Sequence, residues 1–135
     1  MIYLLDTDVI IDMLRDANRW KLVIDHLTQQ GSSISAMTYG ELWEGIVANP
    51  NRPNAISELS ELLASFPVLP LIRETLKIYG NIRVRLRRTG EMIGTPDILI
   101  ASTAIEHHLT LVTRNTHHFG RIPNLQILHP SELGS

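Results

Sequence analysis

Short segments with the length of buried strands alternate with longer segments of helical periodicity along the whole chain. The strand-like segments are residues 2–5, 32–35, 67–70, 111–113 and 125–128. The helical segments between them are residues 8–14, 20–27, 38–47, 55–64, 72–88 and 97–107. Strands that alternate with helices pair in parallel and are covered by the helices. The alternation therefore predicts an α/β fold, with a short central parallel sheet flanked by helices.

Three acidic residues stand at or near predicted helix starts, and each has a purely structural explanation. Asp6 directly follows the first strand and would cap the helix after it. Thr38 and Glu41 have the spacing of a capping box. In Thr95-Pro-Asp97, threonine is an N-cap candidate, proline takes the first helical position, and the aspartate lies in the first turn.

The composition limits the class of protein. The 135 residues fit one domain, 1–135, and the chain has no cysteine, which removes disulfides and thiolate metal sites. No stretch approaches the roughly 18 apolar residues of a membrane-spanning helix, and no basic segment precedes the first apolar run, so we expect a cytoplasmic protein without a signal peptide. The formal net charge is −2, so any contact with nucleic acid must come from local patches.

Together, the three acids predict a metal site. Asp6 lies at the carboxyl end of a strand, and Glu41 and Asp97 lie in first turns of helices, so all three can converge at one edge of the sheet. Carboxylates held within a few ångströms repel each other unless a cation or bound protons neutralise them. Ligation by oxygen alone favours Mg²⁺ or Mn²⁺. Such an ion activates water and stabilises charge on a phosphodiester, which is the chemistry of a nuclease.

Four segments in order resemble the PIN-domain family, and in particular its VapC-type toxins. They are Met1–Asp8, Ser35–Gly45, Gly94–Ala101 and Leu111–Phe119, which together span nearly the whole chain. The resemblance implies a PIN-like fold and a metal-dependent endoribonuclease that uses Mg²⁺ or Mn²⁺. It also implies a homodimer and a partner, a VapB-like antitoxin that covers the active site.

The resemblance also assigns roles to individual residues. It places Asp6, Glu41 and Asp97 in the catalytic and metal-binding set, with Asn115 as a further catalytic residue. Asn115 and His118 stand where relatives often have aspartate, so a fourth carboxylate and a second metal ion are not implied.

Five neighbouring residues receive supporting roles. Thr113, together with Asn115, is expected to orient Asp6 or a metal-bound water, and Arg114 to contact a phosphate or form a surface ion pair. His118 is expected to contact substrate, relay a proton or lie on a helix surface. Asp8 and Glu44 are expected near the site without being direct metal ligands.

Two other functions compete with the nuclease. Residues 6–9 fit the motif of haloacid-dehalogenase-like phosphatases, but that family needs a lysine after a later strand, and Lys21 and Lys77 both lie in predicted helices. A PIN-fold module that only binds RNA or a partner would need no metal ion for its interaction.

Two basic features remain. The adjacent pairs His107-His108 and His117-His118 point about 100° apart on a helix and do not predict a zinc site. Arg83, Arg85, Arg87 and Arg88 form either a solvated surface or a contact for RNA phosphates or an acidic partner.

Overall fold

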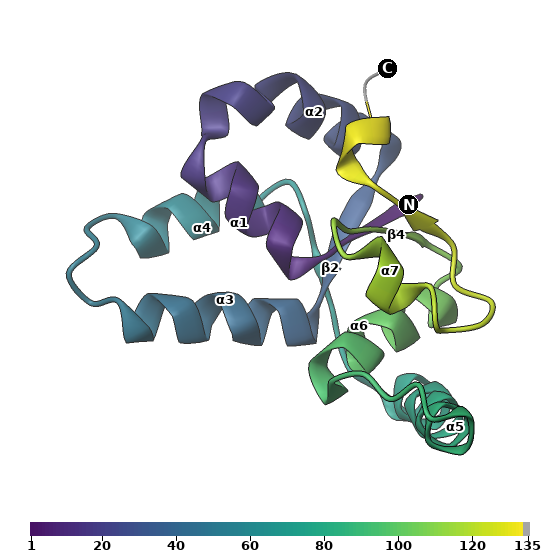
Figure 1. The fold of residues 1–135 in the computed structure, drawn as a ribbon. Helices are drawn as coiled ribbons and strands as arrows, with labels where there is room; N and C mark the ends of the chain where they lie inside the picture. Colours follow the sequence, from purple (N-terminus) through teal and green to yellow (C-terminus); the bar gives the residue numbers. More distant parts are fainter. Residues whose placement is uncertain (134–135) are drawn as a thin grey trace.

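In the computed structural model, which describes residues 1–133, five strands form one parallel sheet among seven α-helices (Figure 1). The elements in chain order are β1 (Tyr3–Leu5), α1 (Thr7–Arg15), α2 (Ala17–Gln30), β2 (Ser32–Ser35), α3 (Ala36–Ala48), α4 (Ala55–Leu63), β3 (Val68–Leu69), α5 (Arg73–Thr89), α6 (Thr95–Glu106), β4 (Thr110–Val112), α7 (Thr116–Phe119), β5 (Ile127–Leu128) and a 3-10 turn (Pro130–Glu132). The strand order is β3-β2-β1-β4-β5, and every neighbouring pair is parallel. The predicted α/β class is confirmed.

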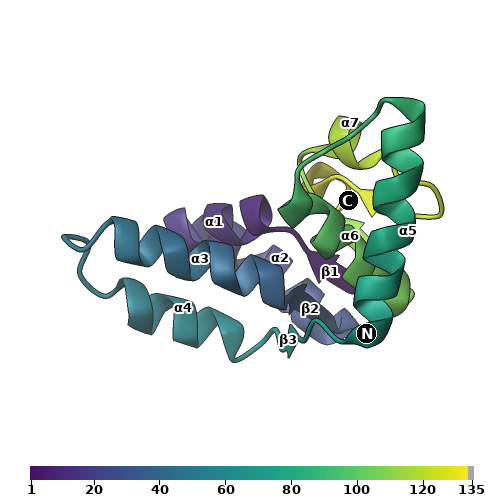
Figure 2. The ribbon, with the colours of Figure 1, turned by 90° about the horizontal axis from the view of Figure 1, so that it is seen from below.

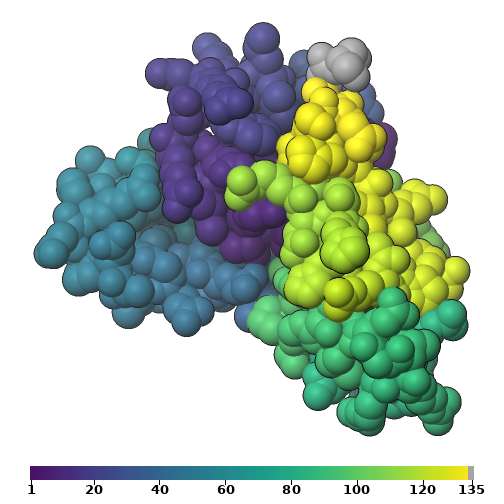
Figure 3. Space-filling view, viewed as in Figure 1, coloured from purple at the N-terminus to yellow at the C-terminus, as the bar shows by residue number. Residues whose placement is uncertain are grey.

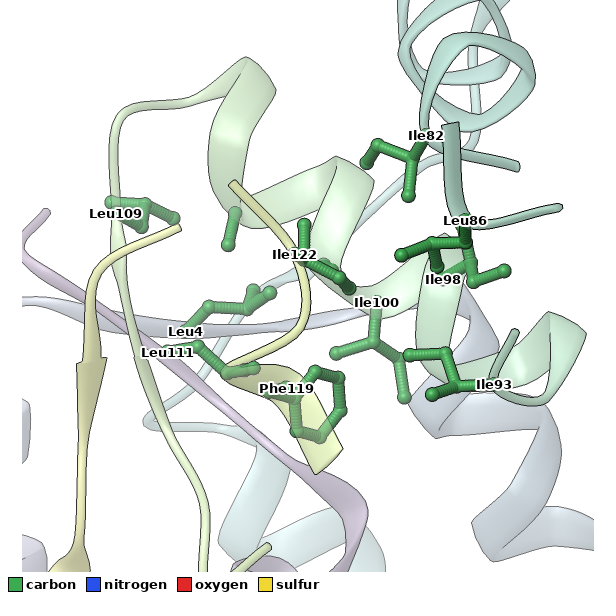
Figure 4. Close-up of a cluster of buried hydrophobic side chains, with 12 residues drawn as sticks. Leu4, Ile82, Leu86, Ile93, Ile98, Ile100, Leu109, Leu111, Phe119 and Ile122 are labelled. Carbon is green, nitrogen blue, oxygen red and sulfur yellow. The ribbon is translucent and has the colours of Figure 1, made fainter. Parts of the chain in front are cut away.

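Alternate side chains of the central strands enter two separate hydrophobic clusters. In β1, Leu4 belongs to the cluster under α5, α6 and α7, and Leu5 to the cluster under α1, α2, α3 and α4. Leu111 and Val112 of β4 divide in the same way, as the two-residue repeat of a strand requires. Figure 4 shows the first cluster, and Figure 2 shows the two helix groups on either side of the strands. Both faces of the sheet are therefore covered.

Two predicted helix starts are wrong by one or two residues. Helix α3 begins at Ala36, capped by Ser35, whose hydroxyl accepts a hydrogen bond from the Met37 N–H at 3.0 Å. The capping box of Thr38 and Glu41 therefore does not exist, because Ser35 at the end of β2 already provides the cap. Helix α6 begins at Thr95 with Gly94 at the N-cap.

Other boundaries also shifted. Helix α2 starts at Ala17, three residues earlier than predicted, because Asp16 caps it by accepting from the Arg19 N–H at 3.3 Å. Helix α7 and the 3-10 turn were not predicted as elements; both are too short for a visible periodicity. No helix in residues 1–133 has the length and apolar character needed to cross a membrane.

The topology places the polar ends of the two central strands side by side. From β1 the chain proceeds to β2 on one side, whereas β4 joins β1 on the other, so the strand order reverses between β1 and β4. In open parallel sheets, ligands bind outside the carboxyl ends of the strands at this point. Asp6 follows β1 and Thr113 follows β4, so both residues stand at that position.

Candidate active site

The Asp6 carboxylate is buried and held from two sides. Only 6% of the surface of Asp6 is exposed to solvent. Oδ1 accepts a hydrogen bond from the Thr7 N–H at 2.8 Å, and Oδ2 accepts one from the Thr113 hydroxyl at 2.7 Å. The Thr113 hydroxyl in turn accepts from the Asn115 N–H at 3.0 Å. The segment after β4 thus fixes the orientation of the carboxylate that follows β1.

Burial raises the pKa of Asp6 to about 7, from an ordinary value of 3.8. The hydrogen bond from Thr113 opposes the increase, whereas the negative charges of Asp8 and Asp97 add to it. A carboxyl group in this setting binds either a proton or a cation at neutral pH. The electrostatic influence of Asp97 also shows that these two acids, distant in sequence, share one environment.

Glu41 is connected to the same site through Thr7. The Thr7 hydroxyl donates to Glu41 Oε1 at 2.7 Å and lies 3.1 Å from the Thr38 hydroxyl. Thr7 therefore contacts both acids: its backbone N–H donates to Asp6, and its side-chain hydroxyl donates to Glu41. The cap at the end of β2 sets the helical phase of α3, which brings Thr38 and Glu41 toward α1.

Asp97 in the first turn of α6 faces helix α7. The Nδ1 atom of His118 lies 3.5 Å from Asp97 Oδ2 and 2.9 Å from Asn115 Nδ2. Burial raises the pKa of Asp97, and the neighbouring imidazole of His118 opposes that increase. The imidazole of His118 thus contacts both the amide of Asn115 and the carboxylate of Asp97.

Asp8 and Arg114 form a second contact between α1 and the segment after β4. Asp8 Oδ2 accepts from the Arg114 N–H at 3.2 Å, and the Arg114 Nε atom lies 3.8 Å from Asp8 Oδ2 and 3.1 Å from Asp12 Oδ2. Burial raises the pKa of Asp8. The other carboxylate oxygen, Asp8 Oδ1, is buried without a hydrogen-bond partner in residues 1–133.

The chemistry of these side chains fits a hard divalent cation. The donors are carboxylate oxygens, the central one is buried, and Asp8 adds an unpaired buried oxygen beside it. Within residues 1–133, no three His, Asp or Glu side chains stand close enough to enclose an ion by themselves. Mg²⁺ retains several of its own waters and uses one or two carboxylates, so such an enclosure is not required.

The remaining predicted candidates lie apart from this group. Glu44 is exposed on α3, one helical turn from Glu41. Arg83 donates to the Thr95 hydroxyl at 3.1 Å, at the start of α6, whereas Arg85, Arg87 and Arg88 are exposed along α5. His107 lies 3.6 Å from Glu106.

Sequence reasoning missed Thr7, Thr38 and Asp12 as parts of the site. Thr38 was assigned to a helix cap, and Thr7 carried no signal except its position after Asp6. The Thr7–Glu41 contact joins residues 34 positions apart, so no local pattern predicts it. The i, i+4 spacing of Asp8 and Asp12 on one helix face could have indicated a shared partner.

Comparisons with known proteins identify the family of the chain. Residues 3–125 match the family model of the PIN domain. The chain is 32% identical over 127 residues to Ribonuclease VapC2 of Rickettsia felis, covering 93% of this chain and 95% of that protein. It is 35% identical over 124 residues to Toxin FitB of Neisseria gonorrhoeae, covering 86% and 89%.

Solved structures give the same result. The VapBC2 complex of Rickettsia felis, bound to a DNA fragment from its promoter, contains a chain that superimposes with a TM-score of 0.89 at 30% identity, covering 96% of this chain and 98% of that one. VapBC-1 from nontypeable Haemophilus influenzae gives a TM-score of 0.84 at 31% identity, covering 98% and 100%.

Proposed function

This chain belongs to the PIN-domain family, with VapC ribonuclease toxins among its relatives, and we propose that it acts as a metal-dependent endoribonuclease toxin. One observation carries the proposal: the buried carboxylate of Asp6, oriented by Thr113 and raised in pKa by burial and by Asp8 and Asp97. The fold holds this charge at the sheet edge where ligands bind. Family membership removes the phosphatase alternative.

Asp6, Glu41 and Asp97 would hold Mg²⁺ or Mn²⁺ partly through waters of the ion, since no three acids in residues 1–133 enclose an ion by themselves. The bound ion would lower the pKa of water and stabilise the charge of a phosphodiester undergoing attack. Each acid has its own support in this chain. Thr113 orients Asp6, and the Thr7 hydroxyl orients Glu41. His118, which contacts Asn115, lies beside Asp97. The three acids are therefore positioned by hydroxyl groups and an imidazole, and not by a fourth carboxylate.

A VapB-like antitoxin is the partner of this toxin, and we propose a groove for it. The groove, about 270 Å³, lies between α1, α3 and α4, and Glu41 is one of its lining residues. Its apolar lining residues are Ile11, Leu14, Leu42, Ile46 and Leu59, and Gly45 lines it as well. An apolar segment of the antitoxin seated here would reach the active site and block it. We further propose that 1–135 acts as one domain, a homodimer in the cytoplasm, where its RNA substrates are.

Expression of the chain without an antitoxin is expected to arrest bacterial growth, and the Asp6→Asn variant to grow normally. The reason is that cleavage of cellular RNA requires the charge of Asp6. Colony counts and growth curves after induction measure the effect, with equal soluble protein confirmed for both forms. Normal growth with soluble wild-type protein would leave the PIN assignment intact and remove the toxin role.

The Gly45→Arg variant is expected to lose affinity for the antitoxin about tenfold or more, the range for an interface residue that blocks packing. A Cβ atom at Gly45 would meet nothing within 4 Å, so the substitution fills the groove without disturbing the fold. Titration calorimetry with the antitoxin gives the dissociation constant.

Gly80→Arg is the matched control, because Gly80 lies inside α5 and is equally open. Both substitutions should raise helix stability by up to about 1 kcal/mol, since glycine is a poor helix former. Equal antitoxin affinity in the two variants would exclude this groove as the binding site.

A further inference from the structure

A pocket of about 510 Å³ lies beside the active site, with Arg114 in its lining. It is bounded by α1, the start of α2 and the C-terminal 3-10 turn, and we call it the α1–α2 pocket. Figure 3 shows the yellow C-terminal segment close to the purple and indigo surface of α1 and α2. The side chains that define its chemistry are Arg15, Arg19, Trp20, Arg114, His129 and Ser131.

Arg114 connects this pocket directly to the active site. Its neighbours in the chain are Thr113, which holds Asp6, and Asn115, which contacts His118. Its backbone N–H is fixed by Asp8, and its Nε atom by Asp12 at 3.1 Å. The guanidinium carries five N–H donors, so its two terminal nitrogens stay available to a ligand. Because Arg114 adjoins both regions, an RNA strand bound at the three acids would place its next nucleotide at the pocket.

The pocket is more cationic than the chain as a whole. Arg15 and Arg19 are exposed, and neither forms an ion pair within residues 1–133. Two carboxylates also line the pocket, but both are engaged: Asp12 pairs with Arg114, and Asp16 caps α2. The lining therefore holds three guanidinium groups and two carboxylates, so its formal charge is positive in a chain whose formal net charge is −2.

Trp20 and His129 add groups that suit a nucleobase. The indole of Trp20 is half-buried and packs against the core cluster below α1 and α2, which fixes its orientation. The His129 Nδ1 atom accepts the Ser131 N–H at 3.1 Å, so the imidazole proton of the neutral ring lies on Nε2 as a donor. An aromatic side chain held in place, with arginines around it, is the combination on which unpaired bases stack in single-strand sites.

We propose that the α1–α2 pocket binds one unpaired nucleotide of the RNA substrate, next to the cleaved linkage. Its phosphate contacts Arg15, Arg19 and Arg114, and its base lies against Trp20. The proposal rests on the ribonuclease function and extends it by a subsite that favours single-stranded RNA. It explains how a chain with negative net charge gains a local hold on a polyanion.

Other surfaces fit less well. Arg85 and Arg88 line a pocket on α5 that includes none of the residues bonded to Asp6 or Asp97. An acidic peptide would also be attracted by the arginines, but it would leave the indole without a stacking partner. The nucleotide uses both features of the pocket.

The chain has two tryptophans, which allows a direct test. A full-length protein with Asp97→Asn and Trp43→Phe keeps Trp20 as its only tryptophan; one with Asp97→Asn and Trp20→Phe keeps Trp43, which is exposed on α3 and stacks on Tyr39. Each is titrated with a short single-stranded RNA of random sequence in EDTA, while indole emission and RNA anisotropy are recorded. RNA should quench Trp20 and leave Trp43 unchanged.

Arg19→Gln gives a second readout, with Lys21→Gln as its control on the same helix outside the pocket. Arg19→Gln should lower the slope of log affinity against log salt by about 0.7, the value for one phosphate contact on a single strand. Lys21→Gln should leave the slope unchanged. Unaltered Trp20 emission during RNA binding, or equal slopes in the two variants, would overturn the subsite alone.

Two further outcomes separate the alternatives. Quenching of Trp20 by polyglutamate and not by RNA would assign the pocket to an acidic peptide and overturn the proposal. Absence of both RNA binding and RNA cleavage by the wild-type protein would overturn the proposed function together with the subsite.

Discussion

Asp6→Asn, Glu41→Gln and Asp97→Asn should each reduce RNA cleavage by more than about 100-fold. Loss of an outer-shell partner of a metal site costs up to about 100-fold, and loss of a residue that holds the ion should cost more. Each substitution removes one of the charges proposed to hold the ion, and keeps the size of the side chain. Asn at position 6 can still cap α1, so the fold should persist. Single-turnover cleavage with circular dichroism of the same samples measures both effects.

Glu44→Gln is the matched control, because Glu44 lies on the same helix as Glu41 and is exposed. It should retain wild-type activity. If Glu41→Gln is as active as Glu44→Gln, Glu41 leaves the catalytic set, and the same comparison applies to the other two acids in turn.

The buried carboxyl group of Asp6 also has a consequence for stability. Its folded-state pKa, about 7, lies above the ordinary 3.8, so folding favours the protonated form. The protonated Asp6 carboxyl group therefore contributes its full stabilisation of the fold below pH 3.8, and this stabilisation is lost as the pH rises through about 7. This change in pKa corresponds to roughly 4 kcal/mol as an upper figure. At pH 8 in EDTA, Asp6→Asn should therefore melt above the wild type.

Thermal unfolding at several pH values, with and without Mg²⁺, measures this difference. The advantage of Asp6→Asn should shrink toward pH 4, where wild-type Asp6 is largely protonated, and Mg²⁺ should raise the melting temperature of the wild type alone. A variant that melts below the wild type at pH 8 in EDTA would show that Asp6 stabilises the fold as an ionised group.

The positions of the proposed acids at strand ends and helix starts could be predicted from the sequence, because local signals mark the elements that carry them. Asp6 follows a short apolar strand, and Asp97 follows a proline at a helix start, so strand ends and first turns were visible in advance. The support of Glu41 could not be predicted, since the Thr7 hydroxyl reaches it through a side-chain contact between residues 34 positions apart. The role of Thr113 beside Asp6 was implied only by the family resemblance, because the two residues lie 107 positions apart and no local pattern connects them.

The capping box shows how a local pattern can mislead. Threonine and glutamate three residues apart fit the motif, but Ser35 precedes them with an extended backbone, and its hydroxyl caps the helix first by accepting from the Met37 N–H. Thr38 is thereby placed inside α3 and buried, where it meets Thr7. The same serine therefore determines both the start of the helix and the side of it on which Glu41 lies.

Cleavage should be hydrolytic, leaving a 5′-phosphate and a 3′-hydroxyl. In the alternative, two histidines act as base and acid while the 2′-hydroxyl of the RNA attacks, which gives a 2′,3′-cyclic phosphate without a metal ion. His118 is the only histidine in contact with one of the proposed acids within residues 1–133, and it lies beside Asp97 and Asn115 rather than opposite a second imidazole. The arrangement of oxygen donors around Asp6 instead suits attack by water with Mg²⁺ or Mn²⁺ present.

EDTA should therefore stop the reaction, and Mg²⁺ or Mn²⁺ should restore it. A single 2′-deoxy substitution at the cut site should slow cleavage only modestly, because the 2′-hydroxyl contributes to recognition and not to bond breaking. Mass spectrometry of the fragments distinguishes the two mechanisms. A cyclic phosphate formed in the presence of EDTA would exclude the metal-dependent route and assign the chemistry to the histidines, with His118 the first to be replaced by alanine.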